Sequence, residues 1–142
     1  MSKRNKIRIK SGRELDLMRA AGKAAAEVLW EVSQFVAAGK TTKEVDLHAA
    51  AVMQRLNCRS AFLGYRGFPA HTCLSLNEEV VHGIGSDRVI QSGDLLSIDV
   101  GVVVNGWIGD NAMTVAVGEI SLLQKRLLAV SYTHLRAHET EA

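Results

Sequence analysis

The sequence predicts an α+β domain in which two long helices pack on a mainly antiparallel sheet. Up to Leu56, apolar residues recur at steps of three and four, as in amphipathic helices. After Asn57, short apolar stretches alternate with glycines, which is typical of strands and ordered loops. Further on, the pair Asn105-Gly106 separates two strand-like runs and predicts a two-residue hairpin turn.

Two capping signals predict where the helices begin. Ser11-Gly12-Arg13-Glu14 has the form of a capping box, so the first helix is expected to start there and to stop at Gly39 in a left-handed conformation. Thr41-Thr42-Lys43-Glu44 repeats the signal and predicts a second helix that reaches about Leu56. The residues expected to face the core are Leu15, Met18, Ala21, Ala25, Val28, Leu29, Val32 and Val36, followed by Val45, Ala49, Val52 and Met53.

Length and composition fit one globular domain without a membrane partner. The chain has 142 residues, of which 47% are hydrophobic and 23% charged. No apolar run approaches the roughly 20 residues that cross a bilayer, and the basic start MSKRNKIRIK is not followed by the apolar segment of a signal peptide. Cys58 and Cys73 have no disulfide or zinc-binding pattern, so the expected location is the reducing cytoplasm.

Charge gives no reason to expect a specific nucleic-acid partner. The formal net charge is +2, too small to indicate a polyanionic ligand. The basic residues Lys3, Arg4, Lys6, Arg8 and Lys10 crowd the first ten positions. A solvated terminus is the favoured interpretation of this cluster, and a nucleic-acid patch is the alternative.

Two aspartates, Asp99 and Asp110, stand among the valines and isoleucines of Ser97–Met113, a segment typical of a buried strand pair. With Asn105-Gly106 as the turn, counting back places Gly101 opposite Asp110. Because strand side chains alternate between faces, both carboxylates point to one side as diagonal neighbours, roughly 7–8 Å apart at the backbone. Gly101 is expected to leave a hollow between them.

Two interpretations of this carboxylate pair are open. Like charges at that separation need a shared proton or a cation, and two divalent ions about 3.5–4 Å apart would fit. Alternatively, one aspartate stands at the entrance of a strand and the other accepts a hydrogen bond from a local backbone amide. His82 is expected to end a short apolar strand that begins at Glu79. Its presence favours the metal site, because its imidazole could bind a substrate amide or stabilise an oxyanion. Taken alone, such a histidine is more often structural.

These residues resemble the type I methionine aminopeptidases, which have the creatinase or pita-bread fold. The resemblance covers roughly residues 7–130, and it implies that the chain forms the N-terminal half of that fold. It is carried by the stretches SGRELDLMRAAGKAA, AAGKTTKEVD, FLGYRGFPAHTCLSLNEEVVHGIG, SGDLLSIDVGVVVNGWIGDNAMTVAVGE and SLLQKRLLAV.

The resemblance implies a role for each candidate residue. Asp99 corresponds to a chelating metal ligand, Asp110 to a bridging ligand, and His82 to the catalytic histidine that contacts the scissile peptide. Four further residues match the pocket for the methionine side chain, namely Phe62, Tyr65, Phe68 and Cys73. A thioether packs well against aromatic edges and sulfur. Ordinary core packing is the alternative explanation for these four.

The implied reaction is metal-dependent removal of the N-terminal methionine from nascent polypeptides. The implied cofactors are two divalent ions, and Co, Mn, Fe and Zn all suit such ligands. A metal-bound water would attack the carbonyl carbon, and the second residue of the substrate would have to be small. The resemblance also implies that the full-length protein is a monomer. Association with the ribosome is expected from family analogy alone.

The pattern breaks off near the C-terminus. The family completes its site with a histidine and two glutamates in its second half, and these have no counterpart in this sequence. From Ser131 the residues SYTHLRAHETEA leave the family pattern and resemble translated adapter sequence. We therefore expect a partial pita-bread domain over residues 1–130 and a non-native tail over 131–142. His134 and His138 lack the glutamate of a zinc-binding HExxH helix.

Two other functions are compatible with the same fold. One is a dipeptidase of the Xaa-Pro type, against which the aromatic pocket residues and the HGIG element argue. The other is a non-catalytic pita-bread module that binds peptides or proteins, against which the intact His82, Asp99 and Asp110 argue. Because general base and metal ligands are missing, the 142-residue chain by itself is expected to be inactive.

Overall fold

The computed structural model describes residues 9–138, which form an α+β unit, as the sequence predicts. Most of the basic N-terminal cluster, Lys3 to Arg8, lies outside the described residues, as do positions 139–142 of the predicted tail. In chain order the elements are α1 (Arg13–Phe35), α2 (Thr42–Arg55), β1 (Arg59–Ser60), the 3₁₀ helix η1 (Tyr65–Gly67), β2 (Cys73–Leu76), β3 (Leu95–Val104), β4 (Trp107–Ala116) and α3 (Leu122–His138).

The sheet is built around β3, and every pairing described within it is antiparallel. One edge of β3 pairs along its whole length with β4. The other edge is shared by two short strands: β2 pairs with the first half of β3, and β1 with the second half. Asn105 and Gly106 form the hairpin turn with φ of 50° and 82°, the positive values that a type I′ turn requires.

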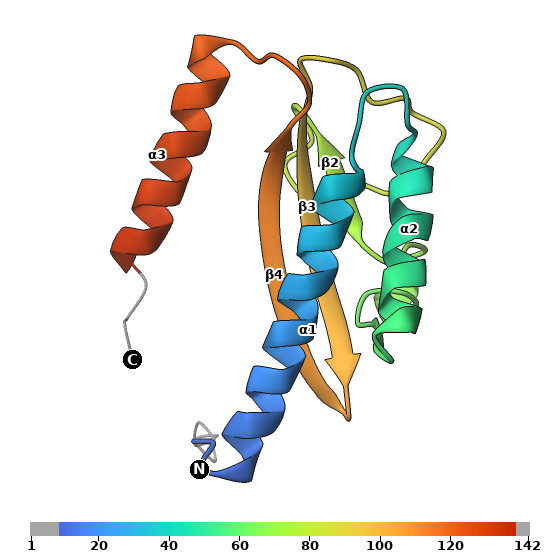
Figure 1. The fold of residues 1–142 in the computed structure, drawn as a ribbon, viewed down its shortest axis with the longest axis vertical. Coiled ribbons are helices and arrows are strands. Elements are labelled where there is room, and N and C mark those ends of the chain that lie inside the picture. Colours follow the sequence, from blue (N-terminus) through green and yellow to red (C-terminus); the bar gives the residue numbers. More distant parts are fainter. Residues whose placement is uncertain (1–8, 139–142) are drawn as a thin grey trace, which may run out of the picture.

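Helices α1 and α2 cover one face of this sheet and enclose the core. In Figure 1, α1 crosses the β3–β4 hairpin with α2 beside it, whereas α3 stands apart on the other side of β4. The alternating residues Leu96, Ile98, Val100 and Val102 of β3 are fully buried against these helices. The helices contribute Ala25, Val28, Leu29, Val32, Val45, Ala49, Val52 and Met53 to the same cluster.

The two helix starts differ from each other. Thr41 caps α2 as predicted, because its hydroxyl accepts from the Glu44 amide while the Glu44 carboxylate accepts from the Thr41 amide. At α1 the predicted capping box is wrong. Gly12 is the capping residue, with φ of 51° and no side-chain hydrogen bond, and the carbonyl of Ser11 accepts from the Glu14 amide.

Two further expectations about α1 are corrected. The helix ends at Phe35, four positions before Gly39, because Val36 already has extended backbone. Gly39 is left-handed, with φ of 91°, but in the connection to α2, where its amide donates to the Ile90 carbonyl. Leu15 and Met18 are more than one-third exposed, so the buried stripe of α1 begins at Ala21. Within residues 9–138, no helix is long and apolar enough to span a membrane.

Candidate functional site

The predicted hairpin register is confirmed, and it places both aspartates on the face of the sheet opposite α1 and α2. Gly101 pairs with Asp110, and Asp99 pairs with Ala112. On the other edge of β3, Asp99 also pairs with Cys73 of β2. Ile98 and Val100 point into the core, so Asp99, which lies between them, points to the opposite face of the sheet. Asp110 and Cys73 face the same way as Asp99.

The two carboxylates interact directly. Burial raises the pKa of Asp99, and the nearby charge of Asp110 and a hydrogen bond with that side chain raise it further, whereas His82 acts in the opposite direction. The expectation that both acids are buried is wrong for one of them. Asp99 is half-buried, but Asp110 is exposed. The pair is therefore open to solvent on one side.

The predicted hollow at Gly101 is filled. An aromatic ring, that of Phe62, occupies the space where a side chain at Gly101 would stand. Phe68 contacts Phe62 edge to face, with ring centroids 6.5 Å apart and planes at 87°. Glycine is therefore needed at position 101 because the ring packs directly on the backbone of β3, and the Phe62–Phe68 pair lies beside the two acids.

Cys73 lies in the next strand beside Asp99 and is 5% exposed. Burial raises the pKa of its thiol to about 11, with further contributions from the charges of Asp99, Asp110 and Asp46. The thiol is therefore protonated at neutral pH and is suited to packing rather than to nucleophilic attack.

A cavity of about 660 Å³ adjoins Asp99. It brings together Cys73, His82 and Asp99 from the predicted site, but Phe62, Tyr65 and Phe68 do not line it. The three aromatic residues therefore lie outside this cavity, and their role in a pocket for the methionine side chain stays a prediction. The Phe62 ring lies over Gly101 and Phe68 packs against that ring, while Tyr65 is 64% exposed in η1. The remaining lining residues are Ser75, Val80, Val81, Ser97, Ile98, Asn111, Ala112, Met113, Thr114, Leu128, Ser131 and Tyr132.

His82 reaches this cavity from a loop, and the strand predicted before it is absent. Val80 and Val81 are 87% and 64% exposed, because this segment has no strand partner along its length. His82 itself has φ of 60°, a left-handed conformation that is uncommon for residues other than glycine.

A buried carboxylate that the sequence analysis missed supports the segment before Cys73. Asp46 of α2 is 7% exposed and accepts hydrogen bonds from the backbone amides of His71 and Thr72, from the Thr72 hydroxyl at 2.7 Å and from the His71 ring at 3.0 Å. Its place on the apolar stripe of α2, next to Val45, was the signal available in the sequence. Asp46 ties α2 to the start of β2.

The two acids fit a divalent cation as part of a larger ligand set. Burial and the nearby charge of Asp110 both raise the pKa of Asp99, a cation would offset both effects, and carboxylate oxygens suit divalent metals. Within the described part of the chain, however, no group of three or more His, Cys, Asp and Glu side chains is placed to hold a metal. Further ligands would have to come from elsewhere.

A hairpin that presents two interacting aspartates beside a cavity with a histidine is compatible with part of a metal-dependent hydrolase. The chain belongs to metallopeptidase family M24, whose sequence pattern matches residues 16–140. Membership in a metallopeptidase family implies the use of a divalent metal.

Comparison with known proteins agrees with this assignment. The chain is 43% identical to a methionine aminopeptidase of Clostridium acetobutylicum over 126 residues, which are 88% of this chain and 50% of that protein. The structure of a methionine aminopeptidase from Thermotoga maritima superposes with a TM-score of 0.88 at 41% identity, over 92% of this chain and 53% of the other. A prolidase from Pyrococcus furiosus has a TM-score of 0.75 at 22% identity over 88% of this chain and 36% of the other, which shows the shared pita-bread fold.

The chain thus spans about half the length of the curated relatives that it matches. The matched half includes both aspartates, His82 and the loop of Phe62 and Phe68. Helix α3 continues through Ser131 without interruption, so the predicted boundary of a non-native tail has no counterpart in the backbone and stays a prediction.

Proposed function

We propose that this chain supplies half of a methionine aminopeptidase, an enzyme that removes the N-terminal methionine from polypeptides by metal-dependent hydrolysis. One observation carries the proposal: Asp99 and Asp110 converge on one face of the β3–β4 hairpin in a chain 43% identical to such an aminopeptidase. The likeness to prolidase, at 22% identity, extends to the fold alone and does not favour the Xaa-Pro alternative.

In this proposal Asp99 and Asp110 are ligands of two divalent ions, drawn from Co, Mn, Fe and Zn. When bound, such ions provide Lewis-acid activation of the peptide carbonyl and of a water molecule. His82 hydrogen-bonds the scissile peptide from the loop beside the cavity and helps to stabilise the charge that develops on its oxygen. The raised pKa of Asp99 is consistent with the cation role, because it reflects first the burial of this carboxylate and then the nearby charge of Asp110, and a bound cation would offset both.

The pocket for the methionine side chain is formed, in this proposal, by Phe62, Phe68 and Cys73, with Tyr65 at its outer margin. Support comes from the position of the Phe62 ring over Gly101, beside both acids, and from the protonated thiol of Cys73. Aromatic edges and sulfur are favourable neighbours for a thioether. Nascent chains in the cytoplasm would be the substrates, and a monomeric full-length enzyme and binding to the ribosome rest on family analogy.

The test compares two proteins with a Met-Gly-Met tripeptide in the presence of Mn or Co. One is the 142-residue chain, and the other is a chimera in which the second half of the Clostridium acetobutylicum relative follows Val130. We expect methionine release by the chimera. The short chain should be slower by at least about 10²- to 10⁴-fold, since the family's general base lies in the missing half.

Controls separate the alternatives. In the chimera, Asp99→Asn and Asp110→Asn should abolish metal-dependent release. Hydrolysis of an Ala-Pro dipeptide in place of Met-Gly-Met would instead indicate the Xaa-Pro activity. A folded chimera that binds the tripeptide but never cleaves it would support the non-catalytic module and overturn the proposal.

A further inference from the structure

We propose that Ser75 is a positioning residue, whose hydroxyl holds the Gly83 peptide on β2 and thereby fixes His82 at the cavity beside Asp99. The contact is independent of the reaction, but its importance for catalysis rests on the function proposed above. Ser75 lies in β2 at 4% exposure, two positions after Cys73 and on the same face of the sheet.

His82 needs such support because its backbone is unfavourable. A φ of 60° brings the β-carbon of a non-glycine residue close to the following carbonyl, so the conformation persists only where neighbouring contacts impose it. The flanking Val80, Val81 and Ile84 are all more than half exposed, so burial of these side chains contributes little to holding the loop.

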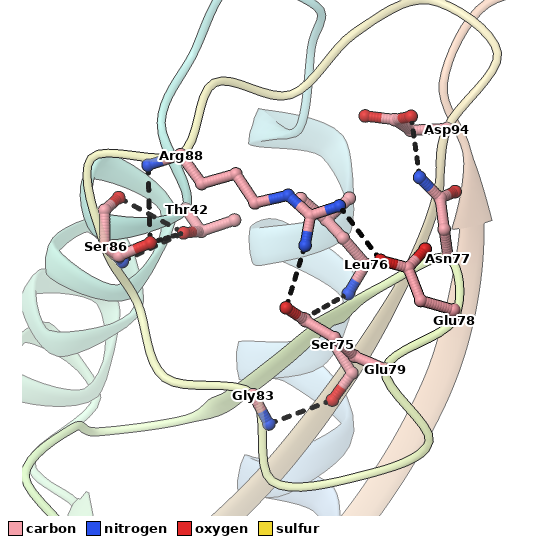
Figure 2. Close-up of polar contacts among 10 residues, drawn as sticks. All are labelled: Thr42, Ser75, Leu76, Asn77, Glu78, Glu79, Gly83, Ser86, Arg88 and Asp94. Carbon is pink, nitrogen blue, oxygen red and sulfur yellow. Dashed lines mark hydrogen bonds and ion pairs between the residues drawn. The ribbon is translucent and has the colours of Figure 1, made fainter.

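The contacts that hold the backbone of His82 in this conformation are made by the next residue, Gly83. The amide of Gly83 donates to Ser75 Oγ at 3.0 Å, and the carbonyl of Gly83 accepts from the Leu74 amide at 2.8 Å. Figure 2 shows the first of these bonds joining the loop to the strand. A side chain at position 83 would overlap the Leu74 carbonyl, so the loop backbone lies directly against β2.

The two ends of the loop are held by separate contacts (Figure 2). Before His82, Glu79 accepts from the Leu76 amide and from Arg88 at 2.8 Å each. After it, the Ser86 amide donates to the Thr42 hydroxyl at 2.9 Å, which ties the loop to the start of α2. These braces set the path of the loop, and the Gly83 contact with Ser75 sets the position of its middle, where His82 stands.

The first test measures amide hydrogen exchange by NMR on the full 142-residue chain. Ser75→Ala should accelerate exchange at Gly83 about tenfold or more, because its amide loses its acceptor. The matched control is Ser97→Ala. Ser97 pairs with Ser75 across the sheet, and its hydroxyl is hydrogen-bonded to the Thr114 hydroxyl at 2.9 Å. Ser97→Ala therefore removes a serine hydroxyl from the same face of the sheet without removing a contact to the loop.

The second measurement reports His82 itself, through the ¹H–¹³C signals of its imidazole. Ser75→Ala should shift these signals and broaden them, whereas Ser97→Ala should leave them in place. Ser75→Thr, which keeps the hydroxyl, should restore both the Gly83 protection and the His82 signals. If the added methyl group prevents folding, the comparison of Ser75→Ala with Ser97→Ala still tests the role of Ser75.

The third measurement uses the chimera described above. We expect Ser75→Ala to lower kcat about 10- to 100-fold while KM for Met-Gly-Met changes little, as for a misplaced catalytic group. An inactive parent chimera would count against the proposed function, and the NMR results would then decide the role of Ser75. Unchanged Gly83 exchange, or faster exchange with unmoved His82 signals, would overturn the positioning role.

Discussion

Ionising Asp99 is unfavourable, because the side chain is half-buried and the nearby charge of Asp110 has the same sign. Its raised pKa means that the folded chain binds a proton at Asp99 more tightly than the unfolded chain does. The stability contributed by this group is therefore complete below its ordinary pKa of 3.8 and is lost as the pH rises through the raised pKa.

Replacing Asp99 by Asn should therefore stabilise the chain at neutral pH. Asn has nearly the same shape but no charge, so the free energy of unfolding should exceed that of the wild type at neutral pH, and the difference should vanish below pH 3.8. Urea unfolding followed by tryptophan fluorescence at several pH values measures it. Asp87→Asn, which removes a carboxylate from a side chain that is 91% exposed, is the control. A less stable Asp99→Asn variant at neutral pH would contradict the electrostatic cost.

At the scale of elements, the two helix starts have similar sequences but different contacts. The Thr41 hydroxyl satisfies a backbone amide of α2, while the capping residue of α1 is Gly12, which makes no side-chain capping bond. Helix N-termini leave amides without intrahelical partners, so a side-chain acceptor there contributes directly to stability.

Thr41→Ala should therefore lower the free energy of unfolding by about 0.5–2 kcal/mol. Ser11→Ala should change it by less than about 0.5 kcal/mol. Urea denaturation of both variants beside the wild type gives the comparison. Equal losses from the two substitutions would mean that the Ser11 hydroxyl caps α1 in solution.

The packing of α1 on β4 allows a second test at this scale. A β-carbon at Gly109 would overlap the Ala21 carbonyl of α1, so Gly109→Ala should destabilise the chain by about 1–3 kcal/mol. Gly22, in the next helical position, has open space around it, and Gly22→Ala should stabilise by about 0.5–1 kcal/mol through helix propensity. The two melting temperatures should move in opposite directions. Tolerance of Gly109→Ala would mean that α1 sits farther from β4.

At the scale of the whole molecule, α3 and the open face of the sheet leave apolar surface exposed. Leu123 and Leu127 are 77% and 59% exposed and lie four positions apart, on one side of the helix. Among the described residues, these two side chains have little intramolecular cover. Contiguous exposed apolar surface promotes association.

The 142-residue chain should therefore self-associate with rising concentration. The double variant Leu123→Lys/Leu127→Lys should weaken this association at least about tenfold, since each buried leucine contributes about 1.5–3 kcal/mol. Sedimentation equilibrium measures both proteins, with Lys125→Ala as a control on the same helix. A wild-type chain that stays monomeric at the highest attainable concentration would contradict the expectation.

The sequence by itself determined the features that depend on neighbouring residues. The Asn105-Gly106 turn sets the register of the hairpin, and the register alone brings Asp99 and Asp110 to one face. The capping box at Thr41 and the apolar stripe of α2 are likewise local, and both are confirmed. These signals are readable because a two-residue turn or a helical period leaves few conformations to choose from.

The tertiary structure decided the features that depend on contacts between distant segments. Phe62 fills the space over Gly101 from a loop, and His82 stands in a loop held by Ser75, although its neighbours in sequence resemble a strand. The buried Asp46 finds its partners 25 and 26 positions away. No local sequence pattern specifies such partners. A buried polar group finds its hydrogen-bond partner only when the helices, strands and loops pack together and exclude water.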